Sequence, residues 1–318
     1  MAATPDETLA EERQRRTKAG AAAIGAGVLT LVGSLLVLAA SRDFPVARLL
    51  ETLRSSLGLD TGTGPLQQVV LYFDDNLVLV AAARIVPAIA TGLTGYALVM
   101  LYRSIKARDP QVGKAALIAS ISGAVLTVVA ATVGTTSLAI QVTDFAGSAQ
   151  QSEDAARDVL SSPFTSGALQ LTLLGTLITA VGLLLTARSA MKVGLLTRFM
   201  GVLGMIVGAL FLIPWLEGSF PFVRIFWLLA LGMLFLHRWP GGMPPAWVTG
   251  EAHPWPTQQE LREQRAAAQA ERSTAAPEDK ARRPRRGRAE PPETPAPEPP
   301  PRAAKAHSSS KKKKRKRR

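Results

Sequence analysis

Long apolar runs separated by short charged segments dominate the first three quarters of the chain. Residues 19–40 pass 22 positions without a charged side chain, and apolar runs of similar length follow at 77–102, 115–142 and 168–186. A helix rises about 1.5 Å per residue, so about 20 residues cross the hydrocarbon core of a bilayer, which is about 30 Å thick. The pattern therefore predicts an all-α, polytopic membrane helix bundle in which these runs are the first four spans.

Two further apolar runs, 199–215 and 220–239, follow the fourth span. Pro214 and Pro221 bracket the few residues between them, which predicts a tight helical hairpin. With this pair the transmembrane domain covers residues 19–239 and holds six transmembrane helices, provided that Arg224 sits at the edge of the last one. A soluble helical core is the alternative for the pair.

A secretory signal peptide is the alternative for residues 19–40, because four basic residues precede this run. The run is longer than the roughly 7 to 15 apolar residues of a signal peptide, and further spans follow it, so we interpret it as a membrane anchor. Residues 1–18 then form a cytoplasmic N-terminal segment.

Lysine and arginine are concentrated on alternate segments between the apolar runs. Three segments carry 11 of them in 42 positions: 1–18, 103–114 and 187–198. The other three carry four in 67 positions: 41–76, 143–167 and 216–221. Because basic side chains resist translocation, the first set is expected in the cytoplasm, and both termini lie there if the number of spans is even.

The two long segments of the second set contain helical patterns of their own. Residues 46–57 place apolar side chains on one helical face, as expected of a helix that lies in the membrane interface or caps the bundle. Residues 144–160 are predicted to form a polar helical loop that ends before Pro163.

Small and hydroxyl side chains recur on one face of the third and fourth spans. On the third they are Ser120, Ala124, Thr127, Ala131, Gly134 and Gln141, and on the fourth Thr172, Gly175, Thr176, Thr179, Gly182 and Thr186. Small faces let helix backbones approach closely, so we interpret these faces as helix–helix seams. A polar path lined by hydroxyl groups between the two spans is the alternative.

The sequence changes character after residue 239. Trp239, Trp247 and Trp255 are spaced by eight residues among prolines and glycines, so they cannot form a stripe on one helix. Indole rings favour the headgroup layer of a membrane, and we interpret the three as interfacial anchors and residues 240–256 as a Trp/Pro-rich juxtamembrane segment. A proline-rich docking site for a protein partner is the alternative.

Residues 257–318 are predicted to be a disordered, Pro-rich and polybasic tail. Residues 251–318 contain 19 of the 37 Lys and Arg and 11 of the 22 prolines, and they carry +10 of the net charge of +13. Such a composition buries too little apolar surface to offset chain entropy. The chain closes with eight consecutive basic residues: Lys311, Lys312, Lys313, Lys314, Arg315, Lys316, Arg317 and Arg318.

We expect this basic run to bind the anionic phospholipids of the inner leaflet, since each cation near such a surface contributes about 1 kcal/mol. Nucleic acid is the second polyanion that the run could engage, non-specifically and with a steep dependence on salt. A third interpretation is that the run only sets orientation or solubility. The sequence indicates no particular protein partner.

The inventory of reactive side chains argues against an enzyme. The chain has no cysteine, which excludes disulfides, thiolate nucleophiles and cysteine-ligated metals. His237, His253 and His307 have no histidine or carboxylate at i+3 or i+4 with which to form a ligand pair. Phosphate-loop and nucleophile-elbow motifs are missing, and the spans carry no Asp, Glu or His at membrane depth. We therefore predict a non-enzymatic protein without cofactor or metal.

Arg84 is the ionisable residue that lies well inside a predicted span. It is about eight residues from the outer boundary, and Pro87 and Gly92 follow it. A charge inside a membrane is costly unless it is used, so Arg84 is the candidate site residue of a small-solute transporter or channel with a Pro-kinked helix. The alternative is an arginine that snorkels outward or pairs with Asp74 or Asp75.

Three segments carry a resemblance to a known family: SAMKVGLLTRFMGVLGMIVG at 189–208, FWLLALGMLFLHRWPGG at 226–242 and PPAW at 244–247. They resemble uncharacterised six-span bacterial integral membrane proteins. The resemblance is strongest over residues 188–256 and covers the other spans by architecture only. It implies six helices and residence in the bacterial cytoplasmic membrane, and it assigns no active-site residue.

Overall fold

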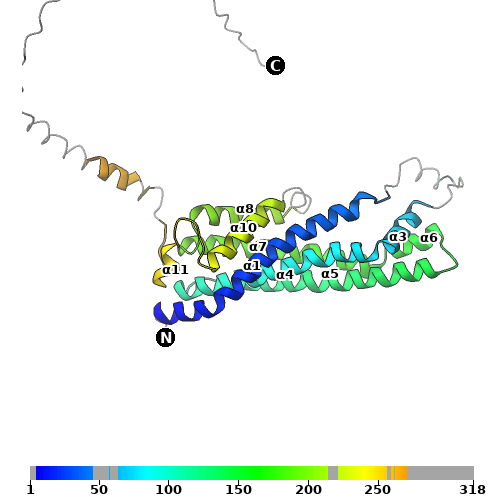
Figure 1. The fold of residues 1–318 in the computed structure, drawn as a ribbon, viewed down its shortest axis with the longest axis horizontal. Helices are drawn as coiled ribbons and strands as arrows, with labels where there is room; N and C mark the ends of the chain where they lie inside the picture. The colour runs from blue at the N-terminus through cyan, green and yellow to red at the C-terminus, as the bar shows by residue number, and fades with distance from the viewer. Residues whose placement is uncertain are drawn as a thin grey trace, which may run out of the picture. The chain divides into compact units, whose positions relative to one another are not determined.

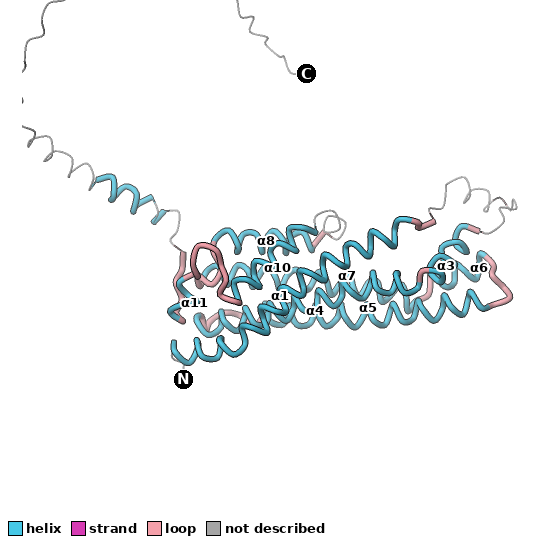
Figure 2. The backbone as a smooth tube through the Cα atoms, in the orientation of Figure 1, coloured by secondary structure: helices cyan, strands magenta, loops and turns pink. Residues whose placement is uncertain are grey.

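The computed structural model describes residues 5–45, 57, 64–213, 221–255, 259–260 and 262–270, and this part of the chain is helical without any strand (Figure 2). The chain divides into two compact units, Met1–Pro256 and Thr257–Arg318. The first unit holds the helix bundle. In the second unit the described residues are helical and exposed, as expected for a segment without an apolar face.

Four long helices form the body of the bundle (Figure 1). They are α1 (Pro5–Arg42), α4 (Leu77–Arg108), α5 (Ala115–Gly147) and α7 (Pro163–Lys192). Helix α5 packs against α7 and α4, and α1 packs against α4. Among the described residues these four helices are long and apolar enough to cross a membrane. The first four predicted spans are therefore confirmed as candidate membrane-spanning helices.

Two shorter apolar helices pack beside them. Helix α8 (Arg198–Phe211) has 14 residues and lies against α7, and α10 (Pro221–Phe235) has 15 residues and lies against α1. At about 1.5 Å per residue each is about 22 Å long, which is less than the core of a bilayer. Most of the described residues of the fifth and sixth predicted spans are thus helical, but the structure does not place these helices among those long enough to cross. The predicted tight turn before Pro221 lies outside the described residues.

The α5–α7 interface contains the small faces predicted for the third and fourth spans. A Cβ added to Gly123 would lie 2.4 Å from the Thr179 nitrogen, and one added to Gly175 would lie 2.7 Å from the Thr127 nitrogen. The hydroxyls of Thr127 and Thr179 donate to carbonyls four residues earlier, both at 2.9 Å. The interface is therefore a close helix–helix seam, as predicted, in which the hydroxyls of Thr127 and Thr179 bond to their own helices, whereas the buried Thr186 hydroxyl has no partner among the described residues.

The end of the bundle away from the N-terminus is closed by two short helices, α3 (Pro65–Asp75) and α6 (Glu153–Leu160) (Figure 1). The Glu153 carboxylate accepts hydrogen bonds from the backbone N–H groups of Leu66, at 3.0 Å, and Gln67, at 3.2 Å. An acid at this position satisfies open donors at the start of α3. The predicted loop 144–160 thus contains the last turn of α5 and the whole of α6. The predicted helix 46–57 lies outside the described residues except for Leu57.

At the other end, the segment after α10 folds back over the bundle and forms the short helix α11 (Pro245–Thr249). The Trp247 indole N–H donates to the Leu195 carbonyl at 2.8 Å, and the His253 N–H donates to the Val193 carbonyl at 3.1 Å. The start of α1 and the end of α4 meet this segment, because Arg108 bonds to both Glu12 and the Ala246 carbonyl. We call this region, residues 5–18, 103–114, 187–198 and 236–255, the N-terminal end of the bundle.

Candidate functional site at the N-terminal end

A buried ion pair ties three elements together at the N-terminal end. Arg108, the last residue of α4, pairs through Nη1 and Nη2 with both carboxylate oxygens of Glu12 on α1, and the Nη2 contact is 3.0 Å. Arg108 also donates to the Ala246 carbonyl from Nε, at 3.0 Å, and from Nη2, at 2.7 Å. Its guanidinium is 5.5 Å from the centre of the Trp247 ring.

A further hydrogen bond from Arg108 Nη1 reaches the Ser104 carbonyl at 2.9 Å, and the arginine side chain is fully buried. A buried charge is tolerated where hydrogen bonds and an opposite charge satisfy it, and here every guanidinium nitrogen has a partner. We therefore assign this pair a structural role, and two pockets lie beside it.

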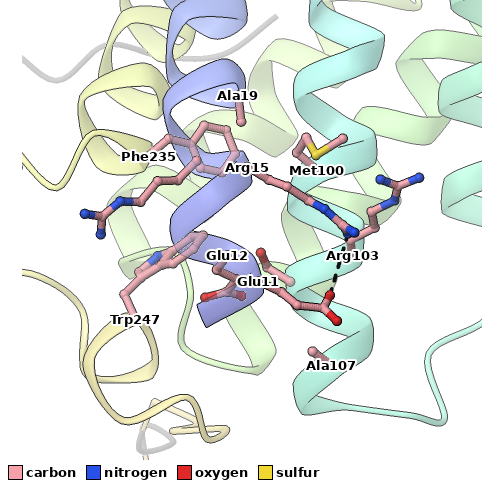
Figure 3. Close-up of a pocket in the computed structure, with 11 residues that line it drawn as sticks. Glu11, Glu12, Arg15, Ala19, Met100, Arg103, Ala107, Phe235 and Trp247 are labelled. Carbon is pink, nitrogen blue, oxygen red and sulfur yellow. Dashed lines mark ion pairs between the residues drawn. The ribbon is translucent and has the colours of Figure 1, made fainter. Parts of the chain in front are cut away.

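The first pocket, which we call the α1–α4 pocket, has a volume of about 100 Å³ and is drawn in Figure 3. Its floor is apolar and its rim is charged. Phe235, Trp247, Met100 and Ala19 contribute apolar surface, and Arg15 and Glu11 on the rim form an ion pair at 3.7 Å (Figure 3). Since both partners of that pair are exposed, it adds little stability.

The second pocket, the α1–α11 pocket, has a volume of about 320 Å³. It lies between the first turns of α1 and the segment after α10. The residues that line it are Leu9, Glu12, Arg13, Arg16, His237, Trp247 and Val248. Glu12, Arg16 and Trp247 border both pockets, so the two lie on either side of the same ion pair.

Positive charge exceeds negative charge around these pockets. Their two carboxylates are matched, because Glu12 pairs with Arg108 and Glu11 with Arg15. Arg13, Arg16 and Arg103 form no ion pair or hydrogen bond with the residues that the structure describes. The N-terminal end is therefore suited to anions.

His237 lies beside Arg13 and Arg16, in the α1–α11 pocket. Its pKa lies below the ordinary value of 6.5, chiefly because the ring is partly buried, and then because Arg16 and Arg13 are close; Glu12 opposes the shift. The residue has a φ of 56°, in the left-handed region, which directs the chain from α10 back towards α11. Its ring packs edge-on against Trp247 with centroids 6.2 Å apart.

The three tryptophans predicted as interfacial anchors differ in their surroundings. Trp247 is 2% exposed, and its indole N–H donates to the Leu195 carbonyl, so this ring packs inside the N-terminal end of the bundle. Trp255 is half-buried and donates to the Leu196 carbonyl at 2.9 Å. Trp239 is partly buried against the main apolar core. The sequence could not show that residues 193–196 would cover these rings.

Arg84 does not contribute to the site. It lies on an exposed side of α4 and forms no hydrogen bond or ion pair with Asp74, Asp75 or any other described residue. It lines neither pocket of the N-terminal end, nor the apolar groove of about 250 Å³ between α5 and α7. An exposed position on a membrane helix agrees with the interpretation of Arg84 as a snorkelling arginine.

Arg224 is a buried arginine that we expected only at the edge of a span. In the structure it is 7% exposed, and its guanidinium stacks 4.4 Å from the centre of the Phe211 ring. Its Nη2 donates to the Thr91 hydroxyl on α4 at 3.2 Å. A charged residue inside an apolar run often has a functional role. In this chain Arg224 connects α10 to α4 through its hydrogen bond to Thr91.

The basic run Lys311–Arg318 lies outside the described residues. Among the residues that are described, no group of three or more histidines or carboxylates could hold a metal ion. No protein-family model, curated protein or solved structure matches this chain.

Proposed function

We propose that this chain is a non-enzymatic integral protein of the bacterial cytoplasmic membrane, with its N-terminal end in the cytoplasm and a tail that binds anionic phospholipids. The observation that carries the proposal is the meeting of the described parts of the three basic segments, 5–18, 103–114 and 187–198, at one end of the bundle. Basic segments are retained in the cytoplasm, so a bundle with all of them at one end has a preferred orientation.

The arrangement of α8 and α10 supports a tail that leaves the bundle at the N-terminal end, on the cytoplasmic side. Both helices begin or end at the N-terminal end, since α8 follows residues 193–197 and α10 leads to His237. Whether the hairpin crosses fully, which gives six spans, or turns back inside the membrane, the chain leaves on the side where it entered. The tail then emerges beside the negatively charged leaflet.

The tail proposal can be tested with one environment-sensitive fluorophore, because the chain has no cysteine of its own. The dye is attached to Ser309→Cys in the full-length protein, which is then placed in nanodiscs of neutral or of anionic lipid. We expect a blue shift only in anionic discs, and its loss at high salt, because the attraction is screened over a Debye length of about 10 Å at 0.1 M salt.

A matched variant replaces the eight residues Lys311–Arg318 with glutamine and keeps the label at position 309. It should show the same spectrum in both kinds of disc. A blue shift that is equal in neutral and anionic discs would contradict the lipid role. Addition of duplex DNA tests the nucleic-acid alternative, which would be supported if DNA changed the spectrum more than anionic lipid does at equal salt.

The transporter or channel hypothesis needs a cavity that reaches Arg84 from one side of the membrane. Its exposed position on α4 does not favour this hypothesis.

A further inference from the structure

We propose that the α1–α11 pocket binds the phosphate headgroup of an anionic phospholipid, held by Arg13 and Arg16. This is a site in the folded bundle, separate from the tail. It rests on residence in a membrane but not on the binding of lipid by Lys311–Arg318.

The charges in the pocket favour one anion. Arg13 and Arg16 project from consecutive turns of α1 and form no ion pair with the described residues. The carboxylate in the pocket, Glu12, is already bound on both oxygens by Arg108. Arginine binds phosphate in a bidentate manner and carries its charge at any physiological pH. His237 adds a ring nitrogen that can donate to the same anion.

The remaining walls of the pocket favour a lipid over a soluble anion. Leu9, Trp247 and Val248 line it with apolar surface, and Val248 is 62% exposed. A free phosphate gains nothing from such walls, whereas the glycerol and first methylenes of a phospholipid bury apolar area there. The volume of about 320 Å³ accommodates a headgroup but not two acyl chains.

The depth of the pocket agrees with the headgroup layer. The apolar part of α1 begins at Ala19, three residues after Arg16 and six after Arg13. At about 1.5 Å per residue, the two arginines lie on α1 about 5 to 9 Å before the apolar part begins. The headgroup region adds about 5 to 8 Å on each side of the hydrocarbon core, so phosphates lie at this level.

The test is native mass spectrometry of the full-length protein in mild detergent, titrated with phosphatidylglycerol or with phosphatidylcholine. We expect one tightly retained phosphatidylglycerol per chain. The double variant Arg13→Gln, Arg16→Gln should weaken this binding by about tenfold or more, since each cation near an anionic headgroup contributes several-fold. Both side chains reach solvent, so the variant should fold, and a monodisperse elution profile checks this.

Two controls separate this site from other basic regions. Arg42→Gln removes an arginine from the far end of the same helix and should leave the affinity unchanged. Replacing Lys311–Arg318 with glutamine should also leave the one tightly bound lipid in place. This outcome is expected whether or not the dye experiment shows that the tail binds lipid.

Three results would overturn the proposal. The first is equal retention of phosphatidylglycerol by the wild-type protein and the double variant. The second is equal retention of phosphatidylcholine, which would show that the headgroup charge is not recognised. The third is displacement of the lipid by glycerol 3-phosphate at equal concentration, which would identify a soluble phosphate ester as the ligand.

Discussion

The Arg108 side chain connects α4 to α1 and α11 through its ion pair and hydrogen bonds. Replacing it with methionine would leave the largely buried Glu12 carboxylate, which is 13% exposed, without its counter-charge and would remove both donors to the Ala246 carbonyl. Removing one partner of a buried ion pair costs about 3 to 5 kcal/mol. We expect Arg108→Met to lower the midpoint of thermal unfolding in detergent far more than Arg103→Gln, which removes an arginine of α4 that forms no ion pair with the described residues.

The single variant Glu12→Gln and the double variant Glu12→Gln, Arg108→Met complete the double-mutant cycle. The double variant should recover part of the stability lost in Arg108→Met, because the charge that was left unpaired is also removed. If the stability losses of Arg108→Met and Glu12→Gln add up to the loss of the double variant, the pair has no energetic coupling and its structural role is contradicted.

His237 gives a prediction about pH. Because burial and Arg16 lower its pKa, the folded state disfavours the protonated ring. The stability contributed by the neutral ring is therefore complete above the ordinary pKa of 6.5 and is lost as the pH falls through the lower folded value. His237→Asn, which tolerates the left-handed backbone, should show a smaller drop in melting temperature between pH 8 and pH 5. An unchanged drop would contradict this assignment.

Phosphatidylglycerol should make the drop in melting temperature between pH 8 and pH 5 smaller in the wild-type protein, because an anion beside His237 raises the pKa of the ring. The same melting curves, recorded with and without this lipid, would show whether the headgroup lies close to the histidine ring. No change on addition of the lipid would place the headgroup elsewhere.

The residues of the site show why sequence reasoning chose Arg84 and missed the others. Depth along an apolar run can be counted from the sequence, but the side of the helix that meets a neighbour cannot, and Arg84 lies on an exposed side. Arg108 pairs with a residue 96 positions away and bonds to a carbonyl 138 positions away. Such partners become visible only when the fold brings the segments together.

At the scale of elements, the α5–α7 seam allows a test with single methyl groups. Gly123→Ala would place its Cβ 2.4 Å from the Thr179 nitrogen, so α5 and α7 would have to separate. Overpacking of this kind costs about 1 to 3 kcal/mol, which thermal unfolding in detergent would detect. Gly167→Ala on α7 is the matched control, because a Cβ there meets nothing within 4 Å.

That control should melt at the wild-type temperature or slightly above, since alanine is the better helix former. The account of the seam would fail if Gly123→Ala and Gly167→Ala melted together.

The helices themselves were largely predictable, and their lengths were less so. Uninterrupted apolar runs located α1, α4, α5 and α7, and the small faces of two of them identified the seam correctly. The last pair was harder, because α8 and α10 have only 14 and 15 residues and hydrophobicity alone does not show how far a hairpin penetrates. The burial of Trp247 depends on tertiary contacts with residues 193–196 and has no local signal.

At the scale of the whole molecule, the account depends on the orientation of the bundle. Both proposed lipid contacts, the tail and the α1–α11 pocket, require the N-terminal end to face the anionic inner leaflet. The two ends of α5 offer matched reporters, because Gly113, just before this helix, and Gly147, its last residue, are both exposed with open space around the Cβ position.

The most direct measurement introduces single thiols at these positions and at Ser309 and treats intact cells with a membrane-impermeant maleimide. The account predicts that Gly147→Cys is labelled in intact cells, whereas Gly113→Cys and Ser309→Cys are labelled only after permeabilisation. Labelling of Gly113→Cys from outside, with Gly147→Cys protected, would place the basic end on the wrong side of the membrane and contradict the central claim.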